Sequence, residues 1–288
     1  MLTGLLRLIA RLPLAWLHGI GGALGWLVYL VSPSYASRLR DNLLQSRVWR
    51  DPGEYQRLLH ANIAESGKAV GELPAIWFRP QQEAVSRVKS VKGWNWVERA
   101  RDAGKGVIVL TPHLGCFEMI PHYLSLHLPM TVLFRPPNFR ALEPVMRSGR
   151  ARARLTLAST DRTGVRLLLK ALKRGEAIGV LPDQVPGGGD GDWAAFFGRP
   201  AYTMSLTARL AQSTGAAVLL TWMKRLPRAA GYELSFEPMP DAEPGETPAQ
   251  LLNRALEAVI RLCPAQYLWS YNRYKIPAGV SSPAEAQS

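Results

Sequence analysis

The sequence has little cysteine, and this excludes two kinds of site. Among its 288 residues only Cys116 and Cys263 are cysteines, too few for a disulfide framework or a cysteine-ligated zinc site. So few thiols suit a folded part that faces the reducing cytoplasm. No basic residue directly flanks Cys116, so we interpret it as a small packing residue and not as a nucleophile.

Motifs for nucleotides and metals are also missing. The run Gly187–Gly189 lacks the Lys-Ser/Thr ending of a phosphate-binding loop. A metal hypothesis would use Glu118 and His122, four residues apart, with His113 or His127 as a third ligand. No second carboxylate or zincin-like motif accompanies them. We therefore expect neither a metal nor a cofactor.

Acidic residues are outnumbered. Lys and Arg total 35 against 22 Asp and Glu, which gives a net charge of +13. Such a surface favours anionic partners: nucleic acid, lipid headgroups or phosphorylated substrates. The positive charge is dispersed, mostly Arg, and basic clusters interleaved with stacking aromatics are missing. We rank lipid or phosphate above nucleic acid and expect no nucleic-acid partner. A non-enzymatic basic protein on anionic membranes stays an alternative.

One long segment has no charge. Residues 12–31 contain no Lys, Arg, Asp or Glu, and a membrane span needs about 20 residues. Proline and several glycines weaken this segment as a span, and arginines flank both ends. It is longer than the apolar core of a secretory signal and lacks a clear cleavage site. We predict a membrane-embedded or interfacial helix that dips into one leaflet.

The remaining pattern predicts an α/β fold. Helices are expected at 35–45, 53–70, 94–103, 117–127, 138–152, 164–174 and 203–214, with a short strand at 88–91 and a glycine-rich loop at 186–192. Buried strands are expected at 107–110, 130–134, 155–158, 177–181 and 217–223, with a half-exposed strand at 232–236 and a closing helix at 249–263. Strand–helix alternation indicates a mostly parallel sheet flanked by helices. We divide the chain into an N-terminal membrane-anchoring helix (1–34), a main domain (35–276) and a flexible tail (277–288).

Three charged residues at helical spacing precede the sheet. Glu65, Lys68 and Glu72 are three and four residues apart, so they share one face of the expected helix. We interpret that face as solvated.

Residues 107–118 are the most informative stretch. A buried strand is followed by a turn with His113, and Glu118 lies five positions further on. Residues five apart on a regular helix point about 140° apart. The two side chains can therefore cooperate only if His113 lies on the turn and Glu118 in the first helical turn. Glu118 would then accept a hydrogen bond from one ring nitrogen and leave the other as a general base.

Further polar residues follow other predicted strands. Arg135 and Asp183, like His113, come within a few residues of a strand end. Carboxyl ends of parallel strands meet at one edge of a sheet, so these side chains are expected to converge. Arg135 and Arg150 are candidates to hold an anionic substrate, and Asp183 to order the site loop.

Several blocks resemble one family in register. His113–Glu118 resembles the His-x4-acid motif of the glycerolipid acyltransferase superfamily. The further blocks are similar to the late acyltransferases of lipid A biosynthesis, the lauroyl and myristoyl transferases. They are Phe134-Arg135-Pro136-Pro137-Asn138, Gly149-Arg150-Ala151-Arg152, Ala171–Glu176, Pro182-Asp183-Gln184, Phe196-Phe197-Gly198, Thr214-Gly215-Ala216 and Pro264–Trp269.

This resemblance implies a glycerol-phosphate acyltransferase-like fold and a specific reaction. A fatty acyl chain would pass from an acyl carrier protein thioester to a hydroxyl of a lipid A precursor, at the cytoplasmic face of the bacterial inner membrane. His113 would be the general base and Glu118 its orienting partner. Substrate-binding residues would be Arg135, Arg150, Asp183 and Gln184.

Two departures bear on the acceptor. Where the family usually has His-Arg after Trp269, this chain has Ser270-Tyr271-Asn272-Arg273, and the loop after Gln184 is unusually rich in glycine. Both leave room for a neighbouring acceptor, such as a lysophospholipid, with the same dyad.

Overall fold

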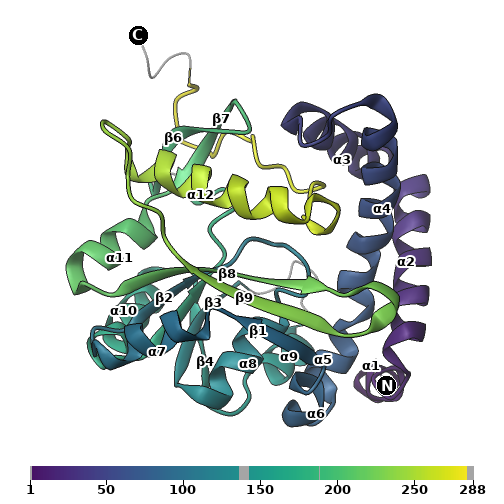
Figure 1. Cartoon of the computed structure of the whole chain (residues 1–288), viewed down its shortest axis with the longest axis horizontal. Coiled ribbons are helices and arrows are strands. Elements are labelled where there is room, and N and C mark those ends of the chain that lie inside the picture. Colours follow the sequence, from purple (N-terminus) through teal and green to yellow (C-terminus); the bar gives the residue numbers. More distant parts are fainter. Residues whose placement is uncertain (1, 136–142, 188, 284–288) are drawn as a thin grey trace.

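A mostly parallel sheet forms the centre of the molecule (Figure 1). The computed structural model describes residues 2–135, 143–187 and 189–283. Within these ranges seven strands form the sheet, in the order β1-β9-β8-β2-β5-β3-β4. Neighbours run parallel except β8 and β9, which are antiparallel. The strands are β1 (Val88–Lys92), β2 (Val107–Leu110), β3 (Met130–Phe134), β4 (Leu155–Ser159), β5 (Ala177–Val180), β8 (Ala217–Arg225) and β9 (Tyr232–Pro238).

Strand β2 lies in the middle and is buried on both sides, as its continuous apolar run predicts. Ile108 and Leu110 belong to the core on one face of the sheet, and Val107 and Val109 to the core on the other. This alternation follows from the two-residue repeat of a strand. The α/β fold with a mostly parallel, helix-flanked sheet is therefore confirmed.

Helices cover both faces of the sheet. On the side of Ile108 and Leu110 the core includes α3 (Pro33–Ser46), α4 (Pro52–Gly71), α10 (Arg162–Lys173), α11 (Leu206–Thr214) and α12 (Pro248–Leu262). On the other side it includes α5 (Leu73–Phe78), α6 (Gln81–Val85), α7 (Trp94–Asp102), α8 (Met119–His127) and α9 (Glu143–Arg150). The expected helix around 138–152 is observed as α9, and its first five residues lie outside the described ranges.

A hairpin replaces part of the expected loop and helix after residue 185. Strands β6 (Gly191–Phe196) and β7 (Arg199–Met204) pair antiparallel, and the following helix begins only at Leu206. Phe197 and Gly198 connect the strands with φ of 47° and 73°, the positive values that tight hairpin turns need. Helix α12 packs against β6, which closes this small layer over the sheet.

The N-terminal segment forms two helices, α1 (Leu2–Ile9) and α2 (Leu14–Val31). Helix α2 packs along α4 at very short range. A Cβ on Gly25 would collide with the carbonyl of Ile63, and one on Gly67 with the carbonyl of Gly21, so only glycine permits this approach.

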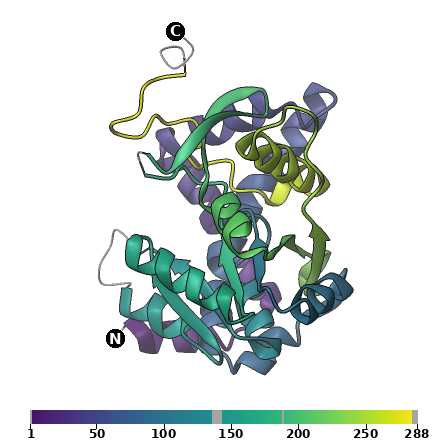
Figure 2. The same ribbon diagram turned by 90° about the vertical axis from the view of Figure 1, so that its left-hand side faces the viewer.

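The outward face of the same segment is apolar. Leu5, Leu8, Trp16, Ile20, Leu24, Leu27, Leu30 and Val31 are exposed. Among the described helices, α2 alone is long and apolar enough to cross a membrane by length and composition. In Figure 1, α2 lies at the right edge, and α10 and α11 lie at the left. Figure 2 looks onto that left-hand side and shows α10 and α11 in the foreground.

Candidate active site

The turn after β2 presents His113 at the carboxyl edge of the sheet. Leu110 ends β2 and is in register with Val180, which ends the neighbouring parallel strand β5. His113 and Asp183 each follow three residues later, so the register brings them together. His113 Nδ1 lies 2.8 Å from Asp183 Oδ1, and the His113 backbone N–H donates to Asp183 Oδ2 at 2.9 Å.

This contact fixes the tautomer of the histidine. Asp183 is buried, which alone would raise the pKa of its carboxyl. The charge of His113 and its two hydrogen bonds outweigh burial and lower that pKa below the ordinary value of 3.8. An ionised carboxylate only accepts, so Nδ1 of His113 carries a proton. In the neutral imidazole the lone pair is therefore on Nε2.

Gln184 occupies the other side of the ring. Its amide nitrogen lies 3.2 Å from His113 Nε2 and acts as the donor to that lone pair. The residue after it is fixed by Tyr271, whose hydroxyl accepts from the Val185 backbone N–H at 3.0 Å. Tyr271 stands where the sequence departs from the family pattern, so the departure contributes directly to the loop that carries Gln184.

Glu118 does not bind His113, contrary to the expectation from the sequence. Its carboxylate accepts hydrogen bonds from Arg150 Nε at 2.9 Å and Trp77 Nε1 at 3.2 Å, and it also pairs with Arg150 Nη2. The expected hydrogen bond to His113 is therefore wrong in geometry. The physical reason is that Asp183 already occupies the Nδ1 side of the ring, whereas Arg150 offers Glu118 a two-pronged, charge-assisted contact.

The Glu118–Arg150 pair is charged. Burial raises the pKa of Glu118, but the adjacent guanidinium lowers it further, so the net shift is downward. Arg150 also lies over the rings of Trp77 and Phe134, at 5.9 and 5.6 Å from their centroids. Two elements thus deliver one fixed cation to the site: α9 carries Arg150, and the segment just before α8 carries its carboxylate partner.

A cavity of about 1410 Å³ connects these groups. His113, Glu118, Gln184, Arg135 and Arg150 all line it, so the structure brings five of the six predicted site residues to one space. The sixth, Asp183, lies behind His113. Arg135 is exposed at the end of β3, and the three residues after it in the family block lie outside the described ranges.

Much of the cavity wall is apolar. Lining side chains come from the strands and from the helices on both faces of the sheet. They include Val109, Ile120, Met130, Val132, Leu133, Leu155, Val165, Leu169, Leu181, Met204 and Leu206. Such a space is suited to a long hydrocarbon chain, with the histidine and the arginines as its polar contacts.

The backbone of the turn is held from behind. Gly115 has φ of 60°, and a Cβ there would collide with the carbonyl of Met223, so this position requires glycine. Its N–H donates to the Gln266 carbonyl at 3.0 Å, and its own carbonyl accepts from Arg225 Nη2 at 2.7 Å. The His113 carbonyl accepts from the Leu268 N–H at 3.0 Å. Tertiary hydrogen bonds therefore fix the conformation that presents the ring.

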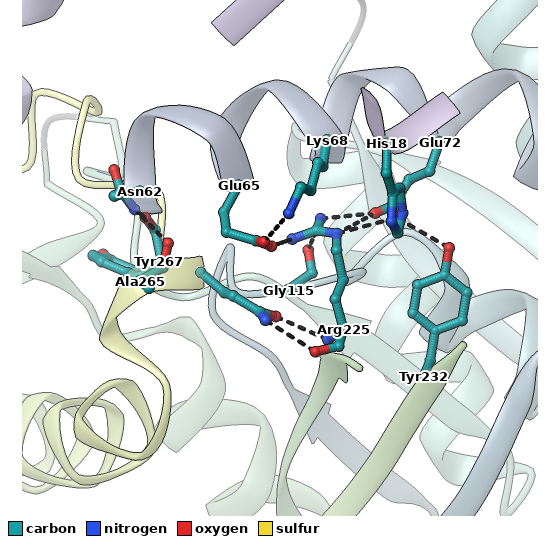
Figure 3. A network of polar contacts seen from close by, with 11 residues as sticks. His18, Asn62, Glu65, Lys68, Glu72, Gly115, Arg225, Tyr232, Ala265 and Tyr267 are labelled. Atoms are coloured by element: carbon teal, nitrogen blue, oxygen red, sulfur yellow. Dashed lines mark hydrogen bonds and ion pairs between the residues drawn. The ribbon is translucent and has the colours of Figure 1, made fainter. Parts of the chain in front are cut away.

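Arg225 belongs to a buried ionic network (Figure 3). It pairs with Glu72 at 2.7 Å and with Glu65 at 3.3 Å, and Glu72 also accepts from Tyr232 and contacts His18. Burial raises the pKa of Glu72, but Arg225 and His18 lower it to about 2. The network joins α2, α4, β8 and β9 to the turn.

The expected solvated face is therefore wrong for Glu72, which is 1% exposed. Sequence reasoning also missed Arg225. The only available signal was an arginine at the end of an apolar strand, which does not reveal a carboxylate partner 153 residues away.

Two other groups near the site have structural surroundings. Cys116 is buried beside Glu72, and burial raises the pKa of its thiol well above the ordinary value. A thiol in that state is a poor nucleophile, which agrees with its interpretation as a packing residue. Among the described residues, no three His, Cys, Asp or Glu side chains are grouped as metal ligands.

Comparison with known proteins gives one consistent result. A family model described as bacterial lipid A biosynthesis acyltransferase matches residues 1–276. The lipid A biosynthesis palmitoleoyltransferase of Escherichia coli is 30% identical over 97% of this chain and 92% of its own. The lauroyltransferase of the same organism is 26% identical with the same coverage, and a Haemophilus influenzae lipid A biosynthesis acyltransferase is 25% identical over 96% of this chain and 90% of its own.

Both kinds of match extend over nearly the whole chain, including the His113 turn and the cavity. The protein therefore belongs to the bacterial lipid A biosynthesis acyltransferase family and is an acyltransferase of the lipid A secondary acylation type.

Proposed function

We propose that the protein transfers a fatty acyl chain from the thioester of an acyl carrier protein to a hydroxyl of a lipid A precursor. The observation that carries this proposal is the His113–Asp183 pair at the polar end of a large apolar cavity. The family membership supplies the acceptor class. The cavity supports a long acyl chain, and the cations on its wall support phosphorylated or acidic substrates.

His113 acts as the general base. A substrate hydroxyl replaces the Gln184 amide at Nε2 and donates its proton to that nitrogen while its oxygen attacks the thioester carbonyl carbon. Asp183 holds the ring and stabilises the imidazolium that forms. When the tetrahedral intermediate collapses, the C–S bond breaks and the imidazolium returns the proton to the leaving thiolate. No protein nucleophile is needed.

Glu118 acts through Arg150 in this proposal. The carboxylate fixes the guanidinium at the cavity wall, where it binds a negative charge on the substrate or on the intermediate. Arg135 provides a second cation at the same edge. The site therefore works with a His113–Asp183 pair beside a Glu118–Arg150 pair, in place of a His113–Glu118 dyad.

The N-terminal helices support association with a membrane, which we take to be the inner membrane at its cytoplasmic face, as the family resemblance implies. α2 packs lengthwise on α4 and turns apolar side chains outward. About a third of the residues of α2 are buried in the protein. This arrangement favours a helix that lies in one leaflet and stays packed against the body of the protein.

The decisive experiment replaces His113 by Ala and follows transfer from acyl carrier protein to a lipid A precursor. Transfer is expected to fall at least about a thousandfold while the variant folds, and Asp183→Asn is expected to lose about a hundredfold to ten-thousandfold in kcat. His127→Ala, an exposed histidine outside the cavity, serves as the matched control. Full activity of His113→Ala would contradict the mechanism.

Lipid mass spectrometry of a deletion strain tests the acceptor. Loss of one secondary acyl chain from lipid A is the expected result. A shifted phospholipid profile with intact lipid A would instead favour a lysophospholipid acceptor. A basic protein without enzymatic activity would leave both lipid classes unchanged.

A further inference from the structure

The outer face of α10 carries only positive charges. Arg162, Arg166, Lys170 and Lys173 are all exposed and are spaced three or four residues apart, so they form one stripe along the helix. The helix has 12 residues and contains no acidic one. We call this stripe the α10 ridge.

The ridge differs from the charged surfaces of α7 and α4. On α7, Arg101 pairs with Asp102, and on α4, Lys68 pairs with Glu65. The four ridge side chains form no ion pair or hydrogen bond with any residue that the structure describes. Like charges at this spacing repel and destabilise a helix by a few tenths of a kcal/mol per pair. A merely solvated helix face would be expected to mix the two signs.

The ridge begins at the active-site cavity. Arg162 and Arg166 line the cavity, and so does Arg209 of the neighbouring helix α11. Beyond Arg166 the stripe continues for about 10 Å to Lys173, since a helix rises about 1.5 Å per residue, and neither Lys170 nor Lys173 lines the cavity. Leu167 lies among these cations with 39% exposure and offers apolar contact area. A partner on the ridge would therefore hold its cargo at the cavity entrance.

The location of the ridge indicates a soluble partner. Helices α1 and α2, which carry exposed apolar side chains, lie on the right side in Figure 1, and α10 lies at the opposite edge. When the apolar face contacts a membrane, the ridge points away from that contact. Lipid headgroups are thus a poor match for it, whereas an acidic protein in solution is a good one.

We propose that the α10 ridge docks the acidic carrier protein that delivers the acyl group as a thioester. This inference rests on the proposed function, because it requires a carrier-bound donor. The ridge cations attract the carrier, and the adjacent cavity receives its acyl chain. Charges at such a docking site mainly govern association and its salt dependence.

The test compares two donors with the same acyl chain, dodecanoyl-acyl carrier protein and the small neutral thioester dodecanoyl-pantetheine. The variant is Lys170→Glu/Lys173→Glu, which changes residues outside the cavity lining. At low ionic strength its KM for the carrier-bound donor is expected to rise about tenfold with kcat within about twofold of wild type. Its KM for dodecanoyl-pantetheine is expected to stay unchanged.

A matched control reverses two exposed cations elsewhere, Arg57→Glu/Lys89→Glu. It changes the net charge equally and is expected to leave both KM values unchanged. Added salt should raise the wild-type KM for the carrier-bound donor toward that of the ridge variant. Lys170→Gln/Lys173→Gln should give an intermediate KM.

Three results would overturn the docking proposal. They are an unchanged KM for the carrier-bound donor, an equal rise for both donors, or a rise of the same size in the control. A ridge variant that instead loses binding to anionic lipid vesicles would assign the ridge to the membrane. Failure of the proposed function looks different, because wild-type protein would then transfer from neither donor.

Discussion

Two arginine–carboxylate pairs flank the His113 turn, and they differ in access. Behind the turn, Glu72 and Arg225 have side chains that are each 2% exposed. In front of it, Glu118 is 10% and Arg150 22% exposed, and both line the cavity. The chemistry of the two pairs is the same. Their surroundings assign them different roles.

The sealed pair is satisfied by the protein itself. Arg225 donates to Glu72, Glu65 and the Gly115 carbonyl, and Glu72 also accepts from Tyr232. In the cavity-side pair, Arg150 uses Nε and Nη2 for Glu118, and its Nη1 donates to no residue in the described part of the chain. The sealed pair therefore supports the turn, and the cavity-side pair has a donor available for a ligand.

The largest effect is expected from breaking the sealed pair. Arg225→Met leaves Glu72 buried without its cation, and removal of one partner of a buried pair costs about 3–5 kcal/mol. The loss is measured as a lower free energy of unfolding in urea, with wild type and variant in the same detergent. The double variant Glu72→Gln/Arg225→Met should recover part of it, because no buried charge is then left unpaired. A loss below about 1 kcal/mol for the single variant would contradict the supporting role.

The cavity-side half of this comparison was largely predictable. Continuous apolar runs identify β2 and β5 as buried parallel strands, and polar residues just beyond them mark the active edge. The convergence of His113, Arg135 and Asp183 on this edge follows from that logic. The partner of His113 does not, because it depends on the register between β2 and β5, which hydrophobic pattern alone leaves open.

The sealed half was not predictable in the same way. Glu65, Lys68 and Glu72 have the spacing of a solvated face. The burial of Glu72 results from α2, which covers α4, and from Arg225 at the far end of β8. The β6–β7 hairpin was missed for a related reason. Its segment alternates weakly and contains Pro200, so its pairing depends on the Phe197–Gly198 turn and on packing against α12.

The second-largest effect is expected in mild acid, where a group on the cavity side should titrate before the sealed pair does. His122 lies on the cavity side, and neither ring nitrogen has a described hydrogen-bond partner. Burial lowers its pKa from 6.5 to about 4. The folded state therefore resists protonation that the unfolded state accepts, and stability falls as pH drops from 6.5 to about 4. A shift of this size corresponds to roughly 3 kcal/mol.

The variant His122→Leu should remove this acid dependence and leave stability at pH 7 equal or higher, since no hydrogen bond is lost. Unfolding midpoints across that pH range measure it, with His60→Leu, at an exposed histidine on α4, as control. In the sealed pair, the pKa of Glu72 is about 2. The contribution of this carboxylate to stability is therefore lost as pH falls from 4.5 to about 2. An unchanged slope in His122→Leu would assign the acid sensitivity to another group.

The smallest effect is expected from a conservative substitution in the cavity-side pair. Arg150→Lys keeps the charge but loses the planar fork that holds Glu118 through Nε and Nη2 and leaves Nη1 as a further donor. Its kcat/KM should fall about tenfold to a hundredfold, or roughly 1.4–2.8 kcal/mol. Stability should change by less than about 1 kcal/mol, because this pair is partly exposed. Arg147→Lys, an exposed arginine on the same helix, provides the control. If Arg150→Lys instead lost stability at full activity, the cavity-side pair would be a second structural support, and the functional contrast between the two pairs would disappear.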